Sequence, residues 1–201
     1  MKKLILASAS PRRREILNTA GLDFDVFVTD TDESVISPLN MPVGMYVQEL
    51  ALLKASACAK TVGKCNSLII SADTIVYMDG KILGKPKNDD DAFSMLKSLS
   101  GKCHSVFTGI CVMRCRDAFS VCKPFETKVY FKELTDDEIR TYIKTGECKD
   151  KAGAYAVQGL GSLFVEKIEG DYFNVVGLPL CGLCEILKNE FDFCVLKGEE
   201  E

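Results

Sequence analysis

The chain has 201 residues, of which 47% are hydrophobic and 27% are charged, a composition typical of a globular protein with a sizeable core. Its formal net charge of -4 argues against a general nucleic-acid-binding protein. An anionic ligand would need a local cluster of Arg and Lys, because the field of the whole molecule does not attract it.

The N-terminus begins with an apolar segment, residues 4–7, that resembles the start of a secretory signal peptide. This segment is followed at once by Ser8, Ser10, Pro11 and three arginines, so it falls far short of such a signal. No stretch approaches the roughly 20 apolar residues of a membrane span. We therefore expect a cytoplasmic protein that does not bind membranes and whose ten cysteines are reduced.

Short apolar segments between turn signals predict strands. They lie at residues 4–7, 24–28, 68–70, 75–77, 81–83, 104–114, 119–131, 163–168 and 172–176. Residues 71–74 are predicted as a turn, Asp79-Gly80 as a hairpin turn, and the last two strands as a hairpin around Gly170.

Helices are predicted between these strands, at residues 12–20, 42–60, 88–100 and 135–145 and from about Pro179 onward. Asn88 is the predicted N-cap of the third helix, and Thr135 with Glu138 forms a capping box at the fourth. The tail, residues 198–201, is predicted to be a frayed acidic end. Because strands and helices alternate throughout, the fold is α/β or α+β with a mixed sheet.

Residues 8–14, with the sequence SASPRRR, stand where the first strand meets the first helix. Free backbone N–H groups, hydroxyl donors and guanidinium groups are what a polyphosphate needs. The alternative interpretation is an ordinary helix cap followed by a solvated basic turn.

Asp73 lies among β-branched residues, where a lone buried carboxylate would be costly and therefore needs a partner. It either binds a metal or acts as a general base toward water, or it is simply hydrogen-bonded in a turn. Gly84-Lys85-Pro86 is not the end of a P-loop, because the glycine spacing is wrong and Pro86 replaces the Ser or Thr that holds magnesium. Lys85 either places a charge on a phosphate or is solvated.

Three further features have a structural alternative. Gln158, in the glycine-rich segment 150–161, offers a donor and an acceptor to a base edge, although a structural turn is the simpler interpretation. His104 is the single histidine and is predicted to be structural. Cys181 and Cys184 form a C-x-x-C without partners for a zinc site, so we predict small buried thiols.

A set of short motifs, taken together, resembles the Maf family. They occur in the family's order at residues 7–13, 72–74, 84–86, 107–109, 142–147, 150–155 and 175–180. The set spans nearly the whole chain and is specific as an ordered set. The resemblance implies an α/β fold with an elongated mixed sheet and flanking helices, in two lobes around a central cleft, similar to Maf and inosine triphosphatase proteins. Residues 1–201 would form a single domain.

The resemblance also implies a nucleoside triphosphate pyrophosphatase that depends on a divalent cation, Mg²⁺ or Mn²⁺. Asp73 matches the family's proposed proton acceptor. The positions that mark the branch acting on dTTP and UTP are matched by Arg12, Thr74 and Gln158, and other polar positions of the cleft are matched by Ser8, Arg13, Glu33, Lys54 and Lys85.

From this resemblance we expect Asp73, Glu33 and Lys54 to be catalytic, with Asp73 and Glu33 also holding the metal. The expected substrate-binding residues are Ser8, Arg12, Arg13, Thr74, Lys85 and Gln158. Ser71 and Ala156 stand where the family usually has Gly, and we expect both to add atoms near the pocket.

The expected partner is a small-molecule nucleotide, dTTP, UTP or a modified pyrimidine triphosphate, and neither nucleic acid nor a membrane. A homodimer is compatible with the sequence. Two alternatives stay open: a pyrophosphatase for a methylated purine triphosphate, and a non-catalytic nucleotide-binding regulator of cell division.

Overall fold

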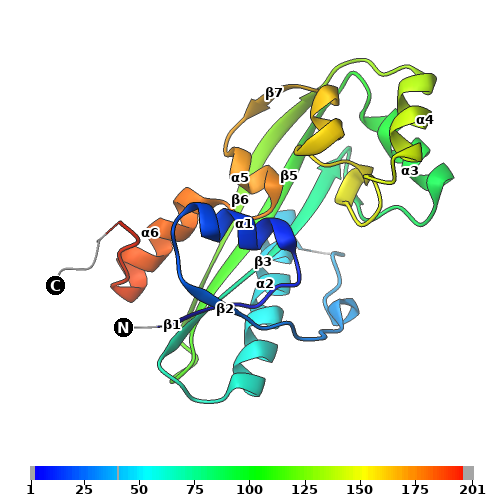
Figure 1. Cartoon of the computed structure of the whole chain (residues 1–201). Helices are drawn as coiled ribbons and strands as arrows, with labels where there is room; N and C mark the ends of the chain where they lie inside the picture. The colour runs from blue at the N-terminus through cyan, green and yellow to red at the C-terminus, as the bar shows by residue number, and fades with distance from the viewer. Residues whose placement is uncertain (1–2, 40, 197–201) are drawn as a thin grey trace. The chain divides into compact units, whose positions relative to one another are not determined.

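The computed structural model describes residues 3–39 and 41–196, which form a seven-stranded mixed sheet with flanking helices (Figure 1). Its strands are β1 (Lys3–Leu6), β2 (Phe24–Val26), β3 (Ser67–Met78), β4 (Lys81–Leu83), β5 (Cys103–Arg114), β6 (Ser120–Phe131) and β7 (Val165–Glu169). Its α-helices are α1 (Pro11–Thr19), α2 (Val43–Val62), α3 (Asp89–Leu99), α4 (Asp136–Lys144), α5 (Tyr172–Val176) and α6 (Leu180–Phe191). Three short 3-10 helices, η1 (Glu33–Val35), η2 (Ala152–Ala154) and η3 (Gly159–Phe164), complete the elements. The predicted α/β class with a mixed sheet is confirmed.

The strand order is β2-β1-β3-β5-β6-β7, and β4 pairs with β3. β1 runs parallel to β2 and β3, whereas β4 and β7 are antiparallel to their partners. In the described part of the chain, no helix is both long and apolar enough to cross a membrane.

The chain divides into two compact units. The first takes its described residues from Met1–Asp73, Thr108–Phe125 and Gly177–Glu201, and the second consists of Thr74–Phe107 and Glu126–Val176. β3, β5 and β6 each pass along the chain from one unit into the other. A single domain with two lobes around a cleft stays a prediction.

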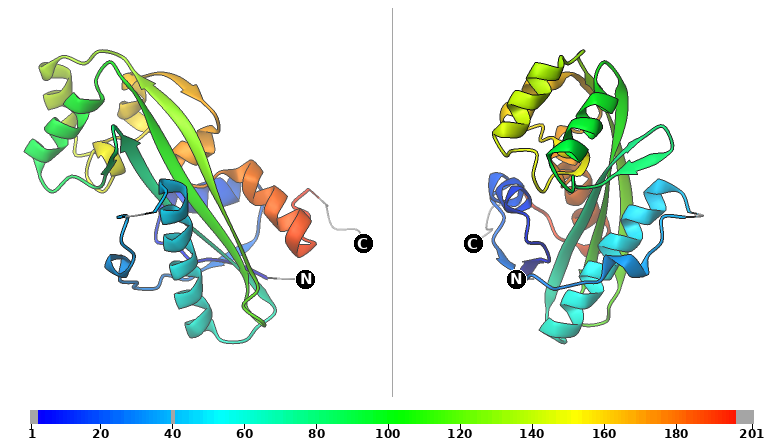
Figure 2. Two further views of the ribbon diagram at one scale, coloured as in Figure 1. Left: turned by 180° about the vertical axis from the view of Figure 1, so that it is seen from behind. Right: turned by 90° about the vertical axis from the view of Figure 1, so that its right-hand side faces the viewer.

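In the first unit, α2 packs directly on the sheet (Figure 2). A side chain at Gly109 of β5 would place its Cβ 2.2 Å from the Val47 carbonyl oxygen, so only glycine allows this approach. The Ser71 hydroxyl of β3 donates to the Ala51 carbonyl at 2.6 Å. These contacts fix α2 over β3 and β5, and with it the side chains on its sheet-facing side.

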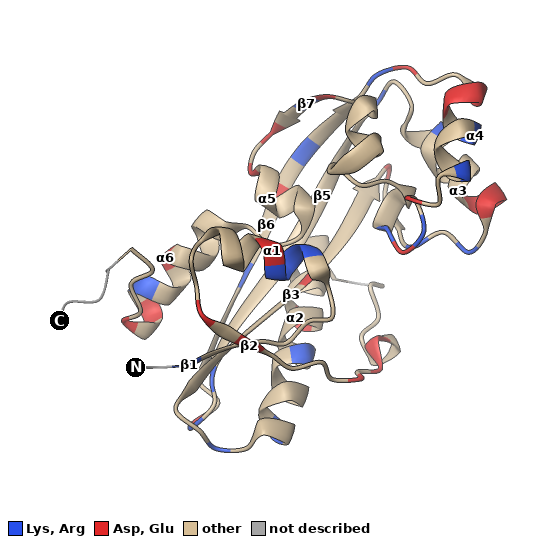
Figure 3. Ribbon diagram, in the orientation of Figure 1, with Lys and Arg blue, Asp and Glu red and all other residues tan. Residues whose placement is uncertain are grey.

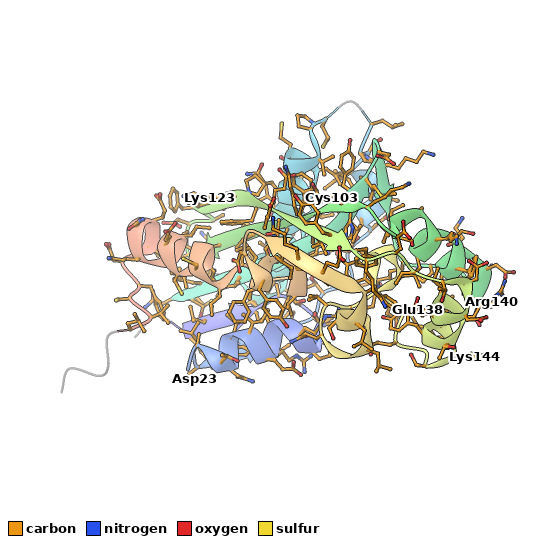
Figure 4. All side chains as sticks on the ribbon, turned by 90° about the horizontal axis from the view of Figure 1, so that it is seen from above. Asp23, Cys103, Lys123, Glu138, Arg140 and Lys144 are labelled. Atoms are coloured by element: carbon orange, nitrogen blue, oxygen red, sulfur yellow. The ribbon has the colours of Figure 1, made fainter. Side chains whose placement is uncertain are left out.

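The second unit has its own apolar core, which α3 and α4 cover. α4 begins with the predicted capping box of Thr135 and Glu138, and Figure 4 labels Glu138 and Arg140 on this helix. The guanidinium carbon of Arg140 lies 4.6 Å from the centroid of the Phe93 ring of α3. His104 is buried in this core and shares a 2.8 Å hydrogen bond between its Nε2 and the Tyr155 hydroxyl. Burial lowers the pKa of His104 to about 4, so the ring is neutral at pH 7. The prediction of a structural histidine is confirmed.

Two predicted elements are wrong. Residues 71–74 are not a turn, because β3 continues through them from Ser67 to Met78. Residues 172–176 form helix α5 and not a strand. The predicted hairpin around Gly170 is therefore absent, and β7 pairs with β6. The Asp171 side chain accepts from the Phe173 amide at 2.8 Å and thereby starts this helix.

The C-x-x-C thiols also differ from the prediction of small buried thiols. Cys181 is exposed and Cys184 is half-buried, because α6 turns Gly182 and Leu183 toward the core instead. All ten cysteines are free thiols in the structure. The predicted frayed tail, residues 198–201, lies outside the described residues.

Candidate functional site

Lys54 of α2 lies between two carboxylates in the first unit. Its Nζ is 2.9 Å from Oε1 of Glu33, on η1, and it also forms a close ion pair with Oδ1 of Asp73, on β3. The side chains of Lys54 and Asp73 are only 17% and 13% exposed, whereas that of Glu33 is 51% exposed. Three segments that are distant in the sequence thus place one cation and two anions at a single point.

The position of Asp73 follows from the alternation of β3. Ser71 and Asp73 lie on the same face of the strand, because side chains two residues apart point the same way. Ser71 binds the backbone of α2 at Ala51, and Asp73 binds Lys54, about one turn further along the same helix. The partner that the buried Asp73 carboxylate was expected to need is therefore Lys54.

The junction of β1 and α1 carries serine hydroxyls and arginine guanidinium groups. Figure 3 marks the basic residues at the start of α1 in blue. The Ser8 hydroxyl accepts from Nη1 of Arg13 at 3.1 Å and from the Ser10 amide at 3.2 Å. Nε of Arg13 donates to the Gly177 carbonyl at 2.8 Å, which fixes the direction of the guanidinium plane. Pro11 occupies the first turn of α1, where its fixed backbone angle favours helix initiation.

The charges of Asp73 and Glu33, the two carboxylates that bind Lys54, also act on Arg13. Burial lowers the pKa of Arg13, while the charges of Asp73 and Glu33 raise it and that of Arg12 lowers it. Arg13 therefore lies within electrostatic range of both carboxylates, with Arg12 beside it.

A polar pocket of about 170 Å³ opens in the first unit. It is lined by Ala7, Ser8, Ala9, Arg13, Thr29, Asp30, Thr31, Glu33 and Lys54. Pockets for whole drug-sized ligands measure about 300–1,000 Å³, so this pocket has room for only part of a nucleotide. Its lining combines hydroxyls and two cations, which suit the phosphate part, with the carboxylates of Asp30 and Glu33.

The other expected residues belong to the second unit. Thr74 follows Asp73 on β3 and is half-buried, and Lys85 is exposed just after β4. The Gly84 carbonyl accepts from the Gly153 amide at 3.0 Å, which ties the Lys85 segment to the glycine-rich segment. Gln158 is half-buried at the start of η3.

Several residues at the site were not expected from the sequence. Tyr46 precedes Lys54 by about two turns of α2 and lies on the same side of the helix. Burial, followed by the charges of Asp73 and Glu33, raises the pKa of Tyr46. Asp30 lines the pocket between Thr29 and Thr31. The helical spacing of Tyr46 and Lys54 was the signal that could have revealed the tyrosine.

Glu33 and Asp73 are the candidate ligands for a divalent cation. No cluster of three or more His, Cys, Asp or Glu residues that could hold a metal occurs among residues 3–39 and 41–196. Glu33 and Asp73, however, converge on one ammonium group. Mg²⁺ usually takes one or two carboxylates together with substrate phosphates and water. The two residues fit Mg²⁺ or Mn²⁺ in that partial role.

Ser71 does not affect the pocket in the way expected. Its hydroxyl is fully buried and donates to the Ala51 carbonyl, and it is not part of the pocket lining. The extra atoms of Ser71 therefore bind α2 to β3 and do not narrow the pocket.

The family model described as Maf-like protein matches residues 3–190. The chain belongs to the Maf family. A relative from Thermoanaerobacter sp. (strain X514) is 53% identical over 194 residues, 96% of this chain and 100% of the relative. A relative from Caldanaerobacter subterraneus subsp. tengcongensis is 51% identical over 189 residues, 94% of this chain and 89% of the relative.

A third Maf relative, from Caldicellulosiruptor saccharolyticus, is 49% identical over 204 residues, 99% of this chain and 100% of the relative. All three relatives are named dTTP/UTP pyrophosphatase. The resemblance inferred from the ordered motifs is thereby confirmed.

Proposed function

We propose that this chain is a nucleoside triphosphate pyrophosphatase that hydrolyses dTTP and UTP to the monophosphate and pyrophosphate. Relatives of about 50% identity over nearly their whole lengths carry that name. The observation that carries the chemistry is Lys54 held between Glu33 and Asp73, beside a polar pocket.

The N-terminus of α1 and the groups around it would bind the phosphates. Ser8 and Arg13 line the pocket together with Lys54, and Arg12 and Lys85 would add further cations. The charged residues in the lining cancel, because Arg13 and Lys54 stand against Asp30 and Glu33. A triphosphate would therefore meet little net positive charge there, which supports the requirement for a divalent cation.

Glu33 and Asp73 would hold the Mg²⁺ or Mn²⁺, which when bound would neutralise charge on the phosphates. Lys54 fixes the Asp73 carboxylate, so Asp73 can accept a proton from the water that attacks the α-phosphorus. The bond to the β-phosphate then breaks, and pyrophosphate leaves. A positioned base of this kind contributes about 10²–10⁴-fold in rate.

Gln158, with Arg12 and Thr74, would select the base. A carboxamide matches the O4 acceptor and N3–H donor of uracil and thymine. The names of the relatives favour these substrates over a methylated purine triphosphate. The convergence of Lys54, Glu33 and Asp73 also favours an enzyme over a regulator that only binds nucleotide.

We further propose a cytoplasmic enzyme that acts on free nucleotides and does not bind nucleic acid. The net charge of -4 supports the last point, because nucleic acid is itself anionic. A homodimer is proposed as its assembly state, and light scattering of the purified protein would distinguish it from a monomer.

Purified protein should convert UTP to UMP and pyrophosphate, and a chelator should abolish turnover until Mg²⁺ or Mn²⁺ is restored. Phosphorus NMR of the mixture identifies the products. Orthophosphate and UDP would mean attack at the γ-phosphorus and would overturn the proposed reaction. CTP and a methylated purine triphosphate serve as comparison substrates.

A further inference from the structure

Glu147 binds the segment that contains Gln158. It lies two residues after Thr145, the C-cap of α4. Its Oε2 accepts from the Leu160 amide at 2.9 Å, and its Oε1 accepts from the Gly161 amide at 2.9 Å. The Tyr142 hydroxyl also donates to Oε1 at 3.1 Å. One carboxylate thus gathers two successive backbone amides and a phenol.

The same network reaches the other side of Gln158. The Tyr142 hydroxyl accepts from the Ala156 amide at 3.3 Å. Ala156 stands two residues before Gln158, and Leu160 stands two residues after it. Glu147 therefore fixes the backbone on both sides of Gln158, directly on one side and through Tyr142 on the other.

Two glycines of this segment allow close approaches, Gly159 to the Glu147 side chain and Gly161 to the backbone of Ala156. Gly159 has a φ of +79°, and an added Cβ would lie 2.6 Å from Oε2 of Glu147. An added Cβ at Gly161 would lie 2.3 Å from the Ala156 carbonyl oxygen. The segment closes tightly on itself, and the carboxylate occupies the position toward which its amides point, as an anion does in a backbone nest.

The end of α4 delivers the carboxylate to this position. Gly146, with a φ of +76°, ends the helix in the left-handed conformation, and the Thr145 hydroxyl accepts from the Glu147 amide at 3.2 Å. Residues 145–147, with the sequence TGE, therefore stop the helix, orient the next amide and return a carboxylate to residues 156–161.

The network is charged at neutral pH. Burial raises the pKa of Glu147, but hydrogen bonds from the Gly161 and Leu160 amides and from Tyr142 together lower it further, so the net pKa is below its usual range. Burial, followed by the charge of Glu147, raises the pKa of Tyr142, which stays a hydroxyl donor.

We propose that Glu147 is a positioning residue for base selection, whose carboxylate holds residues 156–161 in the shape that presents the Gln158 amide in one orientation. This inference rests on the proposed function, in which Gln158 reads the base. Without the carboxylate, the two amides lose their shared acceptor and the segment relaxes. Gln158 can then turn, so that the reversed polarity of cytosine is no longer rejected.

The test compares kcat and KM for UTP and CTP in the wild type and in Glu147→Gln, Tyr142→Phe and Glu166→Gln. Glu147→Gln keeps the size of the side chain but replaces one acceptor by an NH₂ group that faces backbone amides. We expect its UTP-to-CTP ratio of kcat/KM to fall roughly tenfold, mainly because KM for UTP rises. Roughly tenfold is the effect expected when one hydrogen bond to the base is lost. Tyr142→Phe removes the link to Ala156 and one donor to Glu147, but it leaves the Leu160 and Gly161 amides on the carboxylate, so it should lower the ratio less. Glu166 is exposed on β7, and Glu166→Gln should leave the ratio unchanged.

Hydrogen exchange provides a readout that does not depend on activity. The amides of Leu160 and Gly161 should exchange faster in Glu147→Gln, while the amides of helix α3 should keep their protection against exchange. An equal loss of kcat/KM for UTP and CTP would mean a merely structural role and would overturn the inference, as would an unchanged ratio. If Glu147→Gln does not fold, Tyr142→Phe decides, and an unchanged ratio in that variant overturns the inference. A wild type without any preference for UTP over CTP would instead overturn the proposed function.

Discussion

Lys54 and Asp73 form an ion pair in which both side chains are largely removed from solvent. The pair joins helix α2 to strand β3. A buried pair of this kind is costly to break, because removal of one partner leaves the other as an uncompensated charge. Lys54 has a second carboxylate partner, Glu33, whereas Lys54 is the one ion-pair partner of Asp73 among the described residues. The two residues should therefore respond differently to substitution.

Asp73→Asn should abolish turnover and leave the fold intact. Asparagine keeps the shape and can still accept from Lys54, whose charge remains balanced by Glu33, but it cannot serve as a base. We expect kcat for UTP to fall at least about 100-fold, the lower end of the effect of a positioned base, with nucleotide binding retained. Steady-state kinetics and calorimetric titration measure the two quantities. The control is Asp137→Asn at an exposed position of α4. An Asp73→Asn variant with more than about a tenth of the wild-type rate would exclude Asp73 as the base.

Lys54→Met should reduce stability as well as activity. The substitution leaves Asp73 in a mostly buried position without its cation, so the free energy of unfolding should fall by about 1–3 kcal/mol, less than for a fully buried pair because solvent still reaches the site. Urea denaturation measures the change. Adding Asp73→Asn to Lys54→Met should restore part of the lost stability, and a double variant less stable than Lys54→Met alone would contradict this account.

Gly109→Ala should destabilise the protein through the contact between β5 and α2. The added Cβ would meet the backbone of Val47 at 2.2 Å, so the helix that carries Lys54 must move. Overpacking of this kind costs about 1–3 kcal/mol. The matched control is Gly44→Ala on the same helix, where the added Cβ makes an ordinary 3.4 Å contact with Pro124. Equal melting temperatures for the two variants would show that α2 is not fixed by this approach.

Local signals in the sequence were sufficient for elements whose determinants lie within a few residues. The capping box of Thr135 and Glu138 and the Asn88 cap are of this kind, and both are present. Asp73 was different, because a carboxylate among apolar residues indicated a turn. Its partner, Lys54, lies 19 residues earlier in the chain, and only the packing of α2 on β3 makes a continuous strand favourable.

Helix α5 shows the same limit. Its segment has the apolar composition of a strand, but the Thr127 hydroxyl binds the backbone of Asp171, 44 residues away, at the point where the helix begins. For the site, the resemblance to the family identified Ser8, Arg13, Glu33 and Lys54 as cleft residues, and the structure places these four on one pocket. Tyr46 was missed because it is not among the family positions that the resemblance matched.

Stability should decrease in mild acid because of His104. Its pKa is lowered to about 4 in the folded protein, so the unfolded chain binds a proton first as the pH falls below about 6.5. Stability is therefore complete above that pH and is lost progressively down to pH 4, by about 2 kcal/mol between pH 7 and pH 5. Denaturation of wild type and His104→Gln across this range measures the effect. Parallel pH profiles for the two proteins would assign the loss to other groups.

The exposed and the buried cysteines should differ in their reactivity, and the three half-buried ones, Cys65, Cys122 and Cys184, should react at intermediate rates. Cys103, Cys181 and Cys194 are exposed and should react at once with a thiol reagent in the native protein. Cys58, Cys111, Cys115 and Cys148 are buried and should react only on unfolding. Burial raises the pKa of Cys58 to about 11, which further lowers its reactivity. Denatured, unreduced protein that titrates with clearly fewer than ten thiols would contradict the reduced state.

Gln158→Glu should lower kcat/KM for UTP and dTTP much more than for CTP. Uracil and thymine present an acceptor at O4 beside a donor at N3, which a carboxamide held in one orientation matches with one donor and one acceptor. A glutamate replaces the donor by an acceptor and so opposes O4. Cytosine presents an amino donor at that position, so the new carboxylate can accept from it. Sites that leave buried polar groups unpaired can discriminate by about 10⁴-fold or more, so even a partial effect is measurable.

The matched control is the same change at Gln48, the chain's other glutamine. Its side-chain amide donates to the Cys122 carbonyl at 2.9 Å in the first unit. Gln48→Glu loses that hydrogen bond and should lower the melting temperature, but it should leave the UTP-to-CTP ratio unchanged. Competition between UTP and CTP in one reaction gives the ratio of kcat/KM values directly. If Gln158→Glu lowers both values equally, Gln158 binds a part of the nucleotide that the two substrates share, and base selection must be assigned to Arg12 or Thr74.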